Sequence, residues 1–281
     1  MTIVPNSKHA PTKRSHGLSS SSEIVRIANF LRSYLTKSGA KGFVLGLSGG
    51  VDSSVAAALC VKAVGSHRVL GVMLFEDGQE KSRDFIDART VAEKVNLRTI
   101  DLPISHILRS IEQTLHNGRQ QYSRLTLANL KARTRMLLLY ALANQKNLLV
   151  VGTGDRSEIL LGYFTKYGDG AGDILPIAHL YKTEVKALAA ELRLPYDILM
   201  KPSSPNLWKG QRAIDELPAE YELLDRILAE TYENKMDKKI VAKTLGVSKT
   251  LIARTIDMHS KTYHKRAPAV SLERQRRRAA F

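Results

Sequence analysis

The chain has 281 residues, 43% hydrophobic and 25% charged, which is the balance of a globular protein with a substantial core. No apolar run approaches the eighteen or so residues that a membrane span requires, and residues 1–22 hold basic side chains without the apolar stretch of a secretion signal. We therefore expect a cytoplasmic protein with a disordered basic tail over residues 1–22. A net charge of +16 keeps nucleic-acid binding open as an alternative.

The first predicted element is a helix that begins near residue 20. Ser20-Ser21-Ser22-Glu23 fits a capping box, in which the first and last residues of the motif bond side chain to backbone in both directions. Apolar residues then recur at helical spacing, at positions 24, 27, 28, 31 and 35. The folded part of the chain is expected to start there.

The most informative segment is the glycine-rich turn over residues 48–53, which follows the apolar run 43–47 and precedes the helix-like run 55–64. A strand that ends in such a turn and opens a helix points several backbone N–H groups at one spot, where the helix dipole also favours an anion. Gly49 and Gly50 let the backbone approach a phosphate closely. Ser48 and Ser53 add hydroxyl donors, and Asp52 is placed to hold the Mg²⁺ of a nucleotide.

Short β-rich runs alternate with longer helical patterns after this turn. We expect strands over 43–47, 69–74, 97–102 and 148–152, with helices near 53–64, 82–95, 105–115 and 126–146. Such an order requires parallel crossovers and hence a doubly wound α/β sheet with helices on both faces. Ligands bind such a sheet at the carboxyl ends of its strands, so the turns after the first and fourth strands open on one crevice if those strands are neighbours. Beyond residue 185 a small helical C-terminal part is expected.

The chain has a single cysteine, which excludes an internal disulfide framework. Cys60 lies in the second predicted helix between apolar neighbours, where it is expected to be a buried and inert small hydrophobe.

The C-terminal part carries a second feature that suits nucleic acid. Residues 239–254 have the helix, glycine turn and second helix of a helix-turn-helix, and the last 21 residues are rich in Lys and Arg. Two amphipathic helices around a turn are also a common packing unit, and a pocket for a polyanionic ligand needs positive side chains too. We therefore expect nucleic acid not to be the main partner.

Seven stretches taken together identify a family. The turn at 48–53 lacks the Lys of a G-x-x-x-x-G-K-[ST] motif and resembles the S-G-G-x-D-S signature of the PP-loop ATP pyrophosphatases. In order and spacing, the set resembles the ammonia-dependent NAD⁺ synthetases from about residue 24 to about residue 268. The other six stretches are 129–136, 152–158, 162–170, 173–183, 201–211 and 264–266. The resemblance implies a synthetase domain over 23–268, a basic tail over 269–281 and a homodimer.

The reaction that the resemblance implies is the amidation of nicotinic acid adenine dinucleotide, or deamido-NAD⁺. Its carboxylate attacks the α-phosphorus of ATP, pyrophosphate leaves, and ammonia then displaces AMP from the adenylate to give NAD⁺. Catalysis is mostly positioning and neutralisation of phosphate charge, so cations and metal ligands matter more than a nucleophilic side chain. Only 42 residues precede the first predicted strand, so no glutaminase domain is expected there and free ammonia should be the donor.

The resemblance also assigns residues to these ligands. It implies that Asp52 and Glu158 bind Mg²⁺ and, with Lys182, make up the catalytic set. Read singly, Arg133 and Lys182 also fit ordinary solvated helix charges, and Glu158 fits a charge favoured by a helix N-terminus. The residues implied for ATP are Gly46, Leu47, Ser48, Gly49, Gly50, Val51, Asp52, Ser53, Thr153, Lys182 and Ser204, and those implied for deamido-NAD⁺ are Arg133, Lys166, Asp173, His264 and Lys265.

The sequence departs from the family pattern at Ala178-His179, where the family often has Gly-Asp, and after Gln211, where it often has Thr-Asp-Glu. Neither position carries phosphate chemistry. The alternatives are a tRNA-thiolating or lysidine-type enzyme, a GMP- or asparagine-forming amidotransferase, and a non-enzymatic nucleotide- or nucleic-acid-binding module. Thiolation normally relies on cysteines, of which this chain has one, and the amidotransferases carry glutaminase domains.

Overall fold

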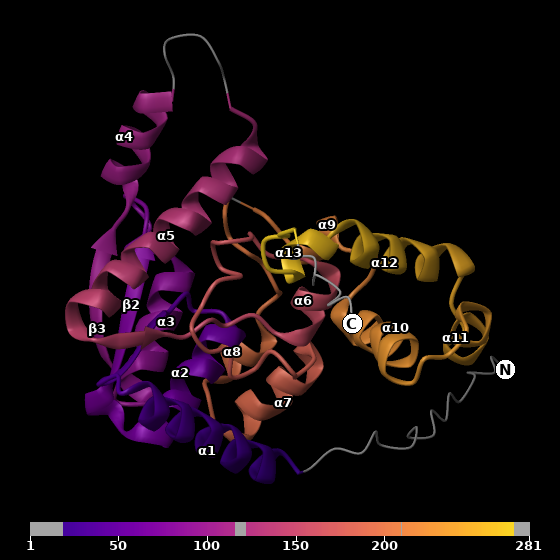
Figure 1. Ribbon diagram of the computed structural model, residues 1–281, viewed down its shortest axis with the longest axis horizontal. Helices are drawn as coiled ribbons and strands as arrows, with labels where there is room; N and C mark the ends of the chain where they lie inside the picture. The colour runs from indigo at the N-terminus through magenta and orange to yellow at the C-terminus, as the bar shows by residue number, and fades with distance from the viewer. Residues whose placement is uncertain (1–18, 116–121, 209, 273–281) are drawn as a thin grey trace, which may run out of the picture.

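The computed structural model describes residues 19–115, 122–208 and 210–272, and is drawn in Figure 1. Its four strands, β1 (Gly42–Gly46), β2 (Val69–Phe75), β3 (Arg98–Pro103) and β4 (Leu148–Val150), form a parallel sheet in the order β3-β2-β1-β4. The predicted doubly wound sheet is confirmed, and the bounds of each strand differ from the prediction by no more than two residues.

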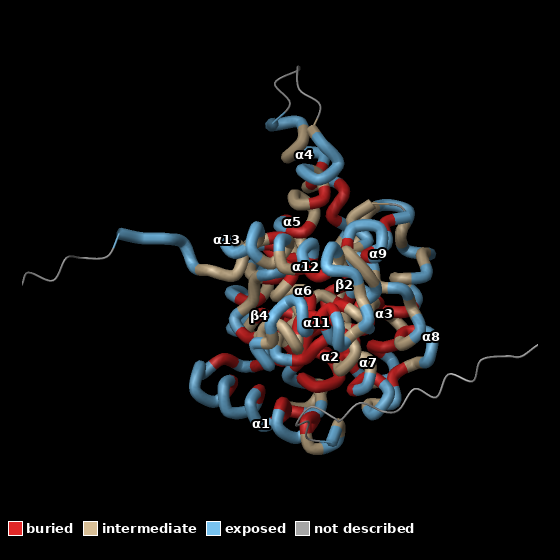
Figure 2. The backbone as a smooth tube through the Cα atoms, turned by 90° about the vertical axis from the view of Figure 1, so that its right-hand side faces the viewer, coloured by how far each residue is buried: buried red, intermediate tan, exposed pale blue. Residues whose placement is uncertain are grey.

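The sheet is covered on both faces, as alternation along β1 requires. Phe43 and Leu45 pack in one hydrophobic cluster with α1 (Ser20–Ser38), α2 (Val51–Val64), α3 (Arg83–Lys94) and α7 (Lys182–Glu191). Val44 points to the other face, where it packs with α5 (Arg124–Lys146). Buried backbone therefore runs through the centre of the molecule, whereas α4 (Ser105–Leu115) and the first turns of α5 project from it (Figure 2).

The second helix of the fold is apolar all around because it lies between layers. Ten residues of α2 are buried, among them Cys60, whose side chain is fully buried as predicted. Burial raises the pKa of the Cys60 thiol far above its usual range, which keeps the sulfur protonated and unreactive.

The start of α1 differs by one residue from the prediction. The capping side chain belongs to Ser19, whose hydroxyl accepts from the Ser22 backbone N–H at 3.3 Å, so the capping box predicted over 20–23 is wrong. Glu23 instead pairs with Arg26 and with His179 on a distant segment, the latter at 2.6 Å. The helix begins inside the tail expected over 1–22, and residues 1–18 lie outside the described part of the chain.

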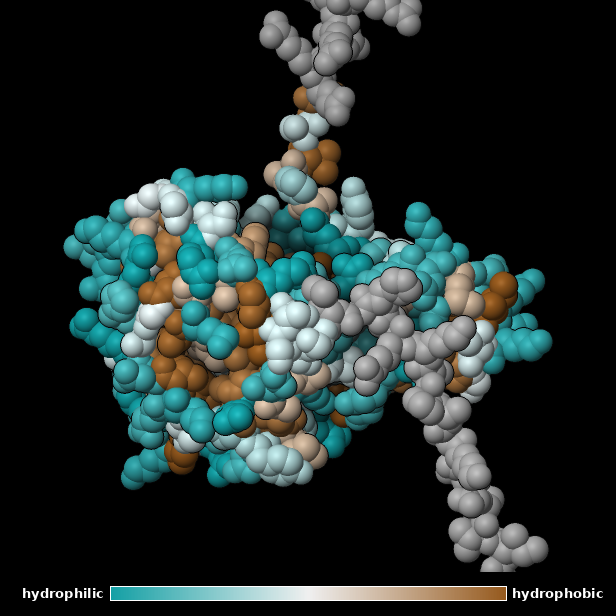
Figure 3. All heavy atoms as spheres, turned by 90° about the horizontal axis from the view of Figure 1, so that it is seen from below, coloured by the Kyte–Doolittle hydropathy of each residue, from teal (hydrophilic) through white to brown (hydrophobic). Residues whose placement is uncertain are grey.

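The chain after β4 is helical, with α6 (Arg156–Leu161) and α7 followed by a smaller C-terminal part, as predicted. The predicted helix-turn-helix is present as α11 and α12, joined at Gly246 in the left-handed conformation. On the face shown in Figure 3, most hydrophobic atoms lie over the sheet-containing half of the molecule. The helices of this part are α8 (Tyr196–Met200), α9 (Ala213–Glu216), α10 (Tyr221–Leu228), α11 (Lys238–Leu245), α12 (Lys249–Lys261) and α13 (Tyr263–Arg266), with one π turn over Ala229–Glu233.

The strand order places two loops at the same edge of the sheet. The chain adds β2 and β3 on one side of β1 and then returns to add β4 on the other side, so β1 pairs with both β2 and β4. The turns that follow β1 and β4 therefore meet at the carboxyl ends of adjacent strands, as predicted, and a cavity of about 490 Å³ opens there. No helix in the described ranges is long and apolar enough to cross a membrane.

Candidate active site

The turn after β1 forms one wall of this cavity. Gly49 has φ +75°, and a Cβ built on it would lie 2.1 Å from the Asp84 carbonyl oxygen, so only glycine fits there. The hydroxyl of Ser53 accepts from the Ser48 backbone N–H at 3.2 Å and lies 3.0 Å from the Ser48 hydroxyl, which fixes the turn from within. With Gly49 as the exception, every residue predicted to hold ATP lines the cavity, as does Glu158.

A buried ammonium group joins the loops that follow β1 and β4. Lys182, the first residue of α7, is 1% exposed. Its Nζ lies 2.7 Å from Asp52 Oδ2, 2.9 Å from Glu158 Oε1 and 3.0 Å from Asp155 Oδ2. It also lies 5.1 Å from the ring centroid of Tyr221, whose electron-rich face favours a cation. Three carboxylates from α2 and α6 thus converge on one ammonium.

Asp155 is the member of this group that the sequence prediction missed. Its side chain is fully buried, caps α6 by accepting from the Glu158 backbone N–H at 2.8 Å, and pairs with Lys182. The signal was available, because Asp155 and Glu158 have the spacing of a capping box. What the sequence does not give is that the second oxygen of the capping carboxylate faces a lysine that follows 27 residues later.

Burial dominates the proton affinities of Asp155 and Glu158, whereas the surrounding carboxylates dominate that of Lys182. It raises the pKa of Asp155 to about 6 and the pKa of Glu158 well above its usual value, against the attraction of Lys182. Burial by itself would lower the pKa of Lys182, but the charges of Asp155, Asp52 and Glu158 raise it well above the ordinary value. Lys182 is therefore an ammonium ion at neutral pH.

The same cluster fits a divalent cation. When its carboxylates are ionised, three negative charges oppose the single positive charge of Lys182. Asp52 Oδ1 is buried and has no hydrogen-bond partner among the described residues. Hard carboxylate oxygens suit Mg²⁺, which usually takes one or two of them together with phosphate and water. No group of three or more His, Cys, Asp or Glu side chains in the described ranges forms a metal cage of its own.

The buried carboxylate of Asp225 positions the helices that carry Glu158 and Lys182. Asp225 on α10 accepts from the Ser157 hydroxyl at 2.5 Å and from the Thr183 backbone N–H at 2.9 Å. The Ser157 oxygen in turn accepts from the Lys182 backbone N–H at 2.9 Å. Asp225 thus ties the first turns of α6 and α7 together and holds Glu158 and Lys182 at a fixed separation.

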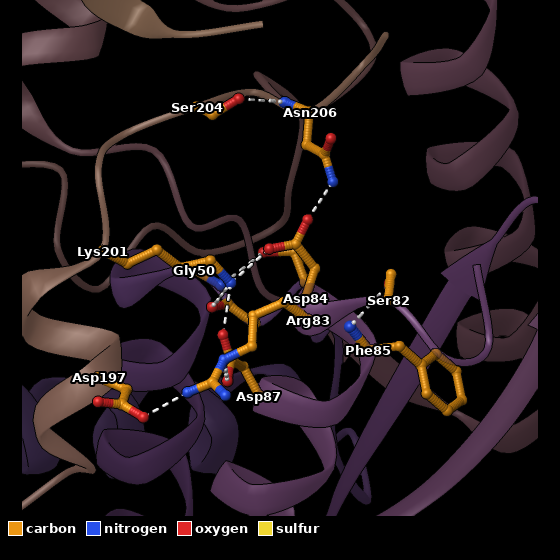
Figure 4. Close-up of polar contacts among 12 residues, drawn as sticks. Gly50, Ser82, Arg83, Asp84, Phe85, Asp87, Asp197, Lys201, Ser204 and Asn206 are labelled. Carbon is orange, nitrogen blue, oxygen red and sulfur yellow. Dashed lines mark hydrogen bonds and ion pairs between the residues drawn. The ribbon is translucent and has the colours of Figure 1, made fainter. Parts of the chain in front are cut away.

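Residues 201–206 form another wall of the cavity, next to the glycine-rich turn at 48–53. Lys201 Nζ donates to the Gly49 carbonyl at 3.1 Å and to Asp87 at 2.7 Å, and also pairs with Asp84 (Figure 4). Asn206 donates to the second oxygen of Asp84. Asp84 and Asp87 of α3, through Lys201, therefore connect this wall to the glycine-rich turn at 48–53. Ser204, predicted to contact ATP, lies on it and donates to the Gln211 carbonyl at 2.6 Å.

The residues predicted to bind deamido-NAD⁺ lie outside the cavity. Lys166 donates to the carbonyls of His264 and Ala267, and its own carbonyl accepts from Arg133 at 3.3 Å. Lys265 donates to the carbonyls at 162 and 164, at 2.8 and 2.7 Å. Four of the five residues thus gather where the glycine-rich segment 162–172 meets α13, and their role in binding stays a prediction.

The fifth residue lies apart from them. Asp173 accepts from the Val150 backbone N–H at 2.8 Å and from the Tyr140 hydroxyl at 3.2 Å. Its carboxylate therefore satisfies the backbone N–H of the last residue of β4. Asp173 therefore has a structural role whether or not it touches a ligand.

Comparisons with known proteins agree with this geometry. A family model described as NAD synthase matches residues 23–269. The NH(3)-dependent NAD(+) synthetase of Hyperthermus butylicus is 43% identical over 258 residues, which cover 90% of this chain and 92% of that protein. The corresponding enzyme of Thermococcus kodakarensis is 42% identical over 250 residues, or 89% of this chain and 96% of that protein.

Two solved structures share the fold over almost their whole length. The NH3-dependent NAD synthetase from Campylobacter jejuni superposes with a TM-score of 0.77 at 28% identity, covering 92% of this chain and 100% of that one. A structure titled NMN synthetase, from Francisella tularensis, superposes with a TM-score of 0.79 at 32% identity, covering 91% of this chain and 99% of that one.

The raised pKa of Asp155 predicts a pH dependence of stability. Between about pH 4 and pH 6 the folded protein keeps a proton that the unfolded chain releases, so the free energy of unfolding should fall as the pH rises. Asp155→Asn has no proton to release there and keeps an oxygen for the cap, so it should flatten this decline. Urea unfolding across that range, without divalent cations, measures both slopes. The exposed Asp257→Asn is the control; a variant slope equal to that of the wild type would contradict the assignment.

Proposed function

Because the chain belongs to the NAD synthase family, we propose that its cavity is where ATP activates the carboxylate of deamido-NAD⁺ for attack by ammonia. The chain catalyses the ATP-dependent formation of NAD⁺ from deamido-NAD⁺ and ammonia through an adenylate, with release of AMP and pyrophosphate. This assignment of the site rests on one observation: the glycine-rich turn at 48–53 and the cluster of carboxylates around Lys182 line the same cavity.

The walls of the cavity suggest how ATP is held. The turn at 48–53 would receive the phosphates, since its amides and hydroxyls lie at the start of α2, where a helix dipole favours anions. Val72, Met73 and Phe85 on the neighbouring wall give the purine base an apolar surface. ATP bound in this way places its α-phosphorus between the turn and the carboxyl end of β4.

The acidic cluster would hold the cation that accompanies ATP. Asp52 and Glu158 would be ligands of Mg²⁺. When bound, the ion would neutralise the negative charge that develops on the pyrophosphate leaving group. Lys182 orients both carboxylates from the protein side, and it adds positive charge to a phosphate-binding turn that has no lysine of its own. Asp155 holds the Lys182 ammonium through a third carboxylate contact, at 3.0 Å.

The environment of Cys60 supports ammonia as the nitrogen donor. A glutaminase needs a reactive thiolate, whereas this thiol is fully buried in α2 and burial raises its pKa. The curated relatives named above are likewise NH(3)-dependent enzymes. The cytoplasmic location expected from the sequence stays a prediction.

The reaction itself is tested by product analysis. The protein is incubated with ATP, Mg²⁺, ammonium and deamido-NAD⁺, and the expected products are NAD⁺, AMP and pyrophosphate in equal amounts. Formation of ADP and phosphate would place the cleavage at the wrong bond. A parallel reaction with nicotinic acid mononucleotide tests the size of the acceptor. We expect the dinucleotide to be preferred because the two NH(3)-dependent NAD(+) synthetases that are 43% and 42% identical to this chain are more similar to it than the NMN synthetase, at 32%.

The proposed role of Asp52 predicts the effect of a change that conserves volume. Asp52→Asn removes a metal ligand but leaves Lys182 its pairs with Asp155 and Glu158. We expect kcat to fall by about two orders of magnitude or more, while the thermal midpoint changes little. Steady-state kinetics and thermal unfolding measure the two effects, with Asp101→Asn on β3 as the control. Near wild-type turnover would remove Asp52 from the metal site.

A homodimer is the assembly that the projecting arm of the molecule favours. Ile107, Ile111 and Leu115 line a shallow hollow along α4, and Leu125 and Leu137 on α5 are 63% and 62% exposed. Exposed large apolar side chains on the projecting α4 and first turns of α5, and farther along α5 at Leu137, are typical of a protein interface (Figure 2). A second copy of this chain would cover them.

The assembly is measurable by sedimentation. Leu137→Lys should shift the protein from dimer towards monomer, because a buried lysine would face an apolar partner surface. Val25→Lys on α1, which is 54% exposed in the chain, is the matched control and should leave the dimer intact. A wild-type chain that sediments as a monomer at micromolar concentration would overturn the proposal.

A further inference from the structure

Three cationic side chains line the cavity, and two of them are fully engaged by the protein. Lys182 contacts three carboxylates, and Lys201 contacts two carboxylates and the Gly49 carbonyl. The third is Arg135 on α5. Within the described ranges, the Arg135 guanidinium makes no hydrogen bond or close ion pair, and its Nε is buried without a partner.

The surroundings of Arg135 explain why it stays unpaired. On its own helix the residues that share the cavity wall are Ala132, Met136 and Leu139, which offer it no acceptor. The nearby carboxylates are already bonded: Glu76 pairs with Lys131 at 2.9 Å, and Asp169 accepts from the Thr165 backbone N–H at 3.0 Å. Burial lowers the pKa of Arg135, while the charges of Glu76 and Asp169 raise it, and a guanidinium remains cationic throughout the working pH range.

The Arg135 side chain is partly buried, and a guanidinium whose Nε is buried without a hydrogen-bond partner destabilises the protein that carries it. Such a group is understandable where a ligand supplies the missing acceptors, because functional sites carry polar groups that are satisfied only in the complex. The fork of donors on an arginine matches two oxygens of one carboxylate or phosphate. Both substrates of the proposed reaction bring such oxyanions into this cavity.

We propose that Arg135 binds a substrate oxyanion in the cavity, either a phosphate of ATP or the carboxylate of the acid that is amidated. This inference rests on the proposed function for the identity of the two substrates. Arg135 comes from α5 and lies near Asp169 of the glycine-rich segment, whereas the turn at 48–53 that is proposed for the phosphates precedes α2. If the bound group is the carboxylate, Arg135 distinguishes substrate from product, because the carboxamide of NAD⁺ offers one acceptor oxygen where the acid offers two.

The first arm of the test measures stability without ligands. Arg135→Met replaces a partly buried cation that has no hydrogen-bond partner by an apolar side chain of similar length, so its thermal midpoint should equal or exceed that of the wild type. Arg32→Met is the matched control, since Arg32 on α1 donates to Asn29 at 2.7 Å and to the Ala63 carbonyl at 3.1 Å, and it should lose stability. A clear loss of stability in Arg135→Met would mean that Arg135 is a structural residue.

The second arm measures kinetics with each substrate varied in turn. Arg135→Met should lower kcat/KM at least about tenfold for one substrate. A rise in KM for deamido-NAD⁺ alone identifies the carboxylate, and a rise in KM for ATP alone identifies a phosphate. Arg135→Lys should restore part of the loss because it keeps the charge without the fork. Unchanged values of both KM and kcat would overturn the proposal.

A third arm keeps this inference separate from the proposed function. ATP, deamido-NAD⁺ and inorganic pyrophosphate are each added to the wild type and to Arg135→Met, and the shift in thermal midpoint is recorded. At least one of these anions should stabilise the wild type more than the variant, whether or not NAD⁺ is formed. Equal shifts for all three would contradict an oxyanion at Arg135, whereas failure of the wild type to make NAD⁺ would contradict the proposed function alone.

Discussion

The ammonium group of Lys182 is the interaction on which the rest of the site depends. Two of its carboxylate partners come from α6 and one from α2, so it connects the loops at the ends of β4 and β1. Lys182 is the one cation among three carboxylates, so removing it would leave negative charge uncompensated in a region of low dielectric constant, whereas removing one carboxylate leaves it two partners. The excess of negative charge also suits the site to a divalent cation, while Asp225 behind it fixes the helices that carry Lys182 and Glu158.

The sheet order explains why these groups meet. With β1 between β2 and β4, the carboxyl ends of β1 and β4 are adjacent, and the helices that follow them, α2 and α6, both contribute residues to the cavity. The positive ends of both helix dipoles then face the same cavity, to which the apolar end of β2 adds a wall. One topological feature thus gathers anion-binding amides, acidic side chains and an apolar surface.

The cations of the cavity fall into two kinds. Lys182 and Lys201 are bonded to the protein and hold its parts together. Lys182 joins the loops after β1 and β4, and Lys201 joins the wall of residues 201–206 to the glycine-rich turn. The Arg135 guanidinium makes no hydrogen bond to any residue that the structure describes, and we infer that it is available to a ligand. A count of basic residues cannot make this distinction, since it depends on which acceptors the fold brings within reach.

The sequence by itself determined the sheet, its helices and the phosphate-binding turn, because these follow from local patterns: apolar runs of strand length, helical periodicity, and glycines between serines and an aspartate. It also gave Asp52, Glu158 and Lys182 through their resemblance to a family. Only the tertiary structure decided that Asp155 shares Lys182, that Asp84 and Lys201 hold the wall of residues 201–206, and that Arg135 has no hydrogen-bond partner among the described residues. Each of these depends on contacts between segments far apart in the chain. The capping pattern of Asp155 uses only one carboxylate oxygen, so the local sequence does not indicate that the other oxygen pairs with Lys182. The physical reason is that burial and partnership of a charge are set by neighbours that meet only when the sheet has formed, whereas helix, strand and turn preferences are set by residues a few positions away.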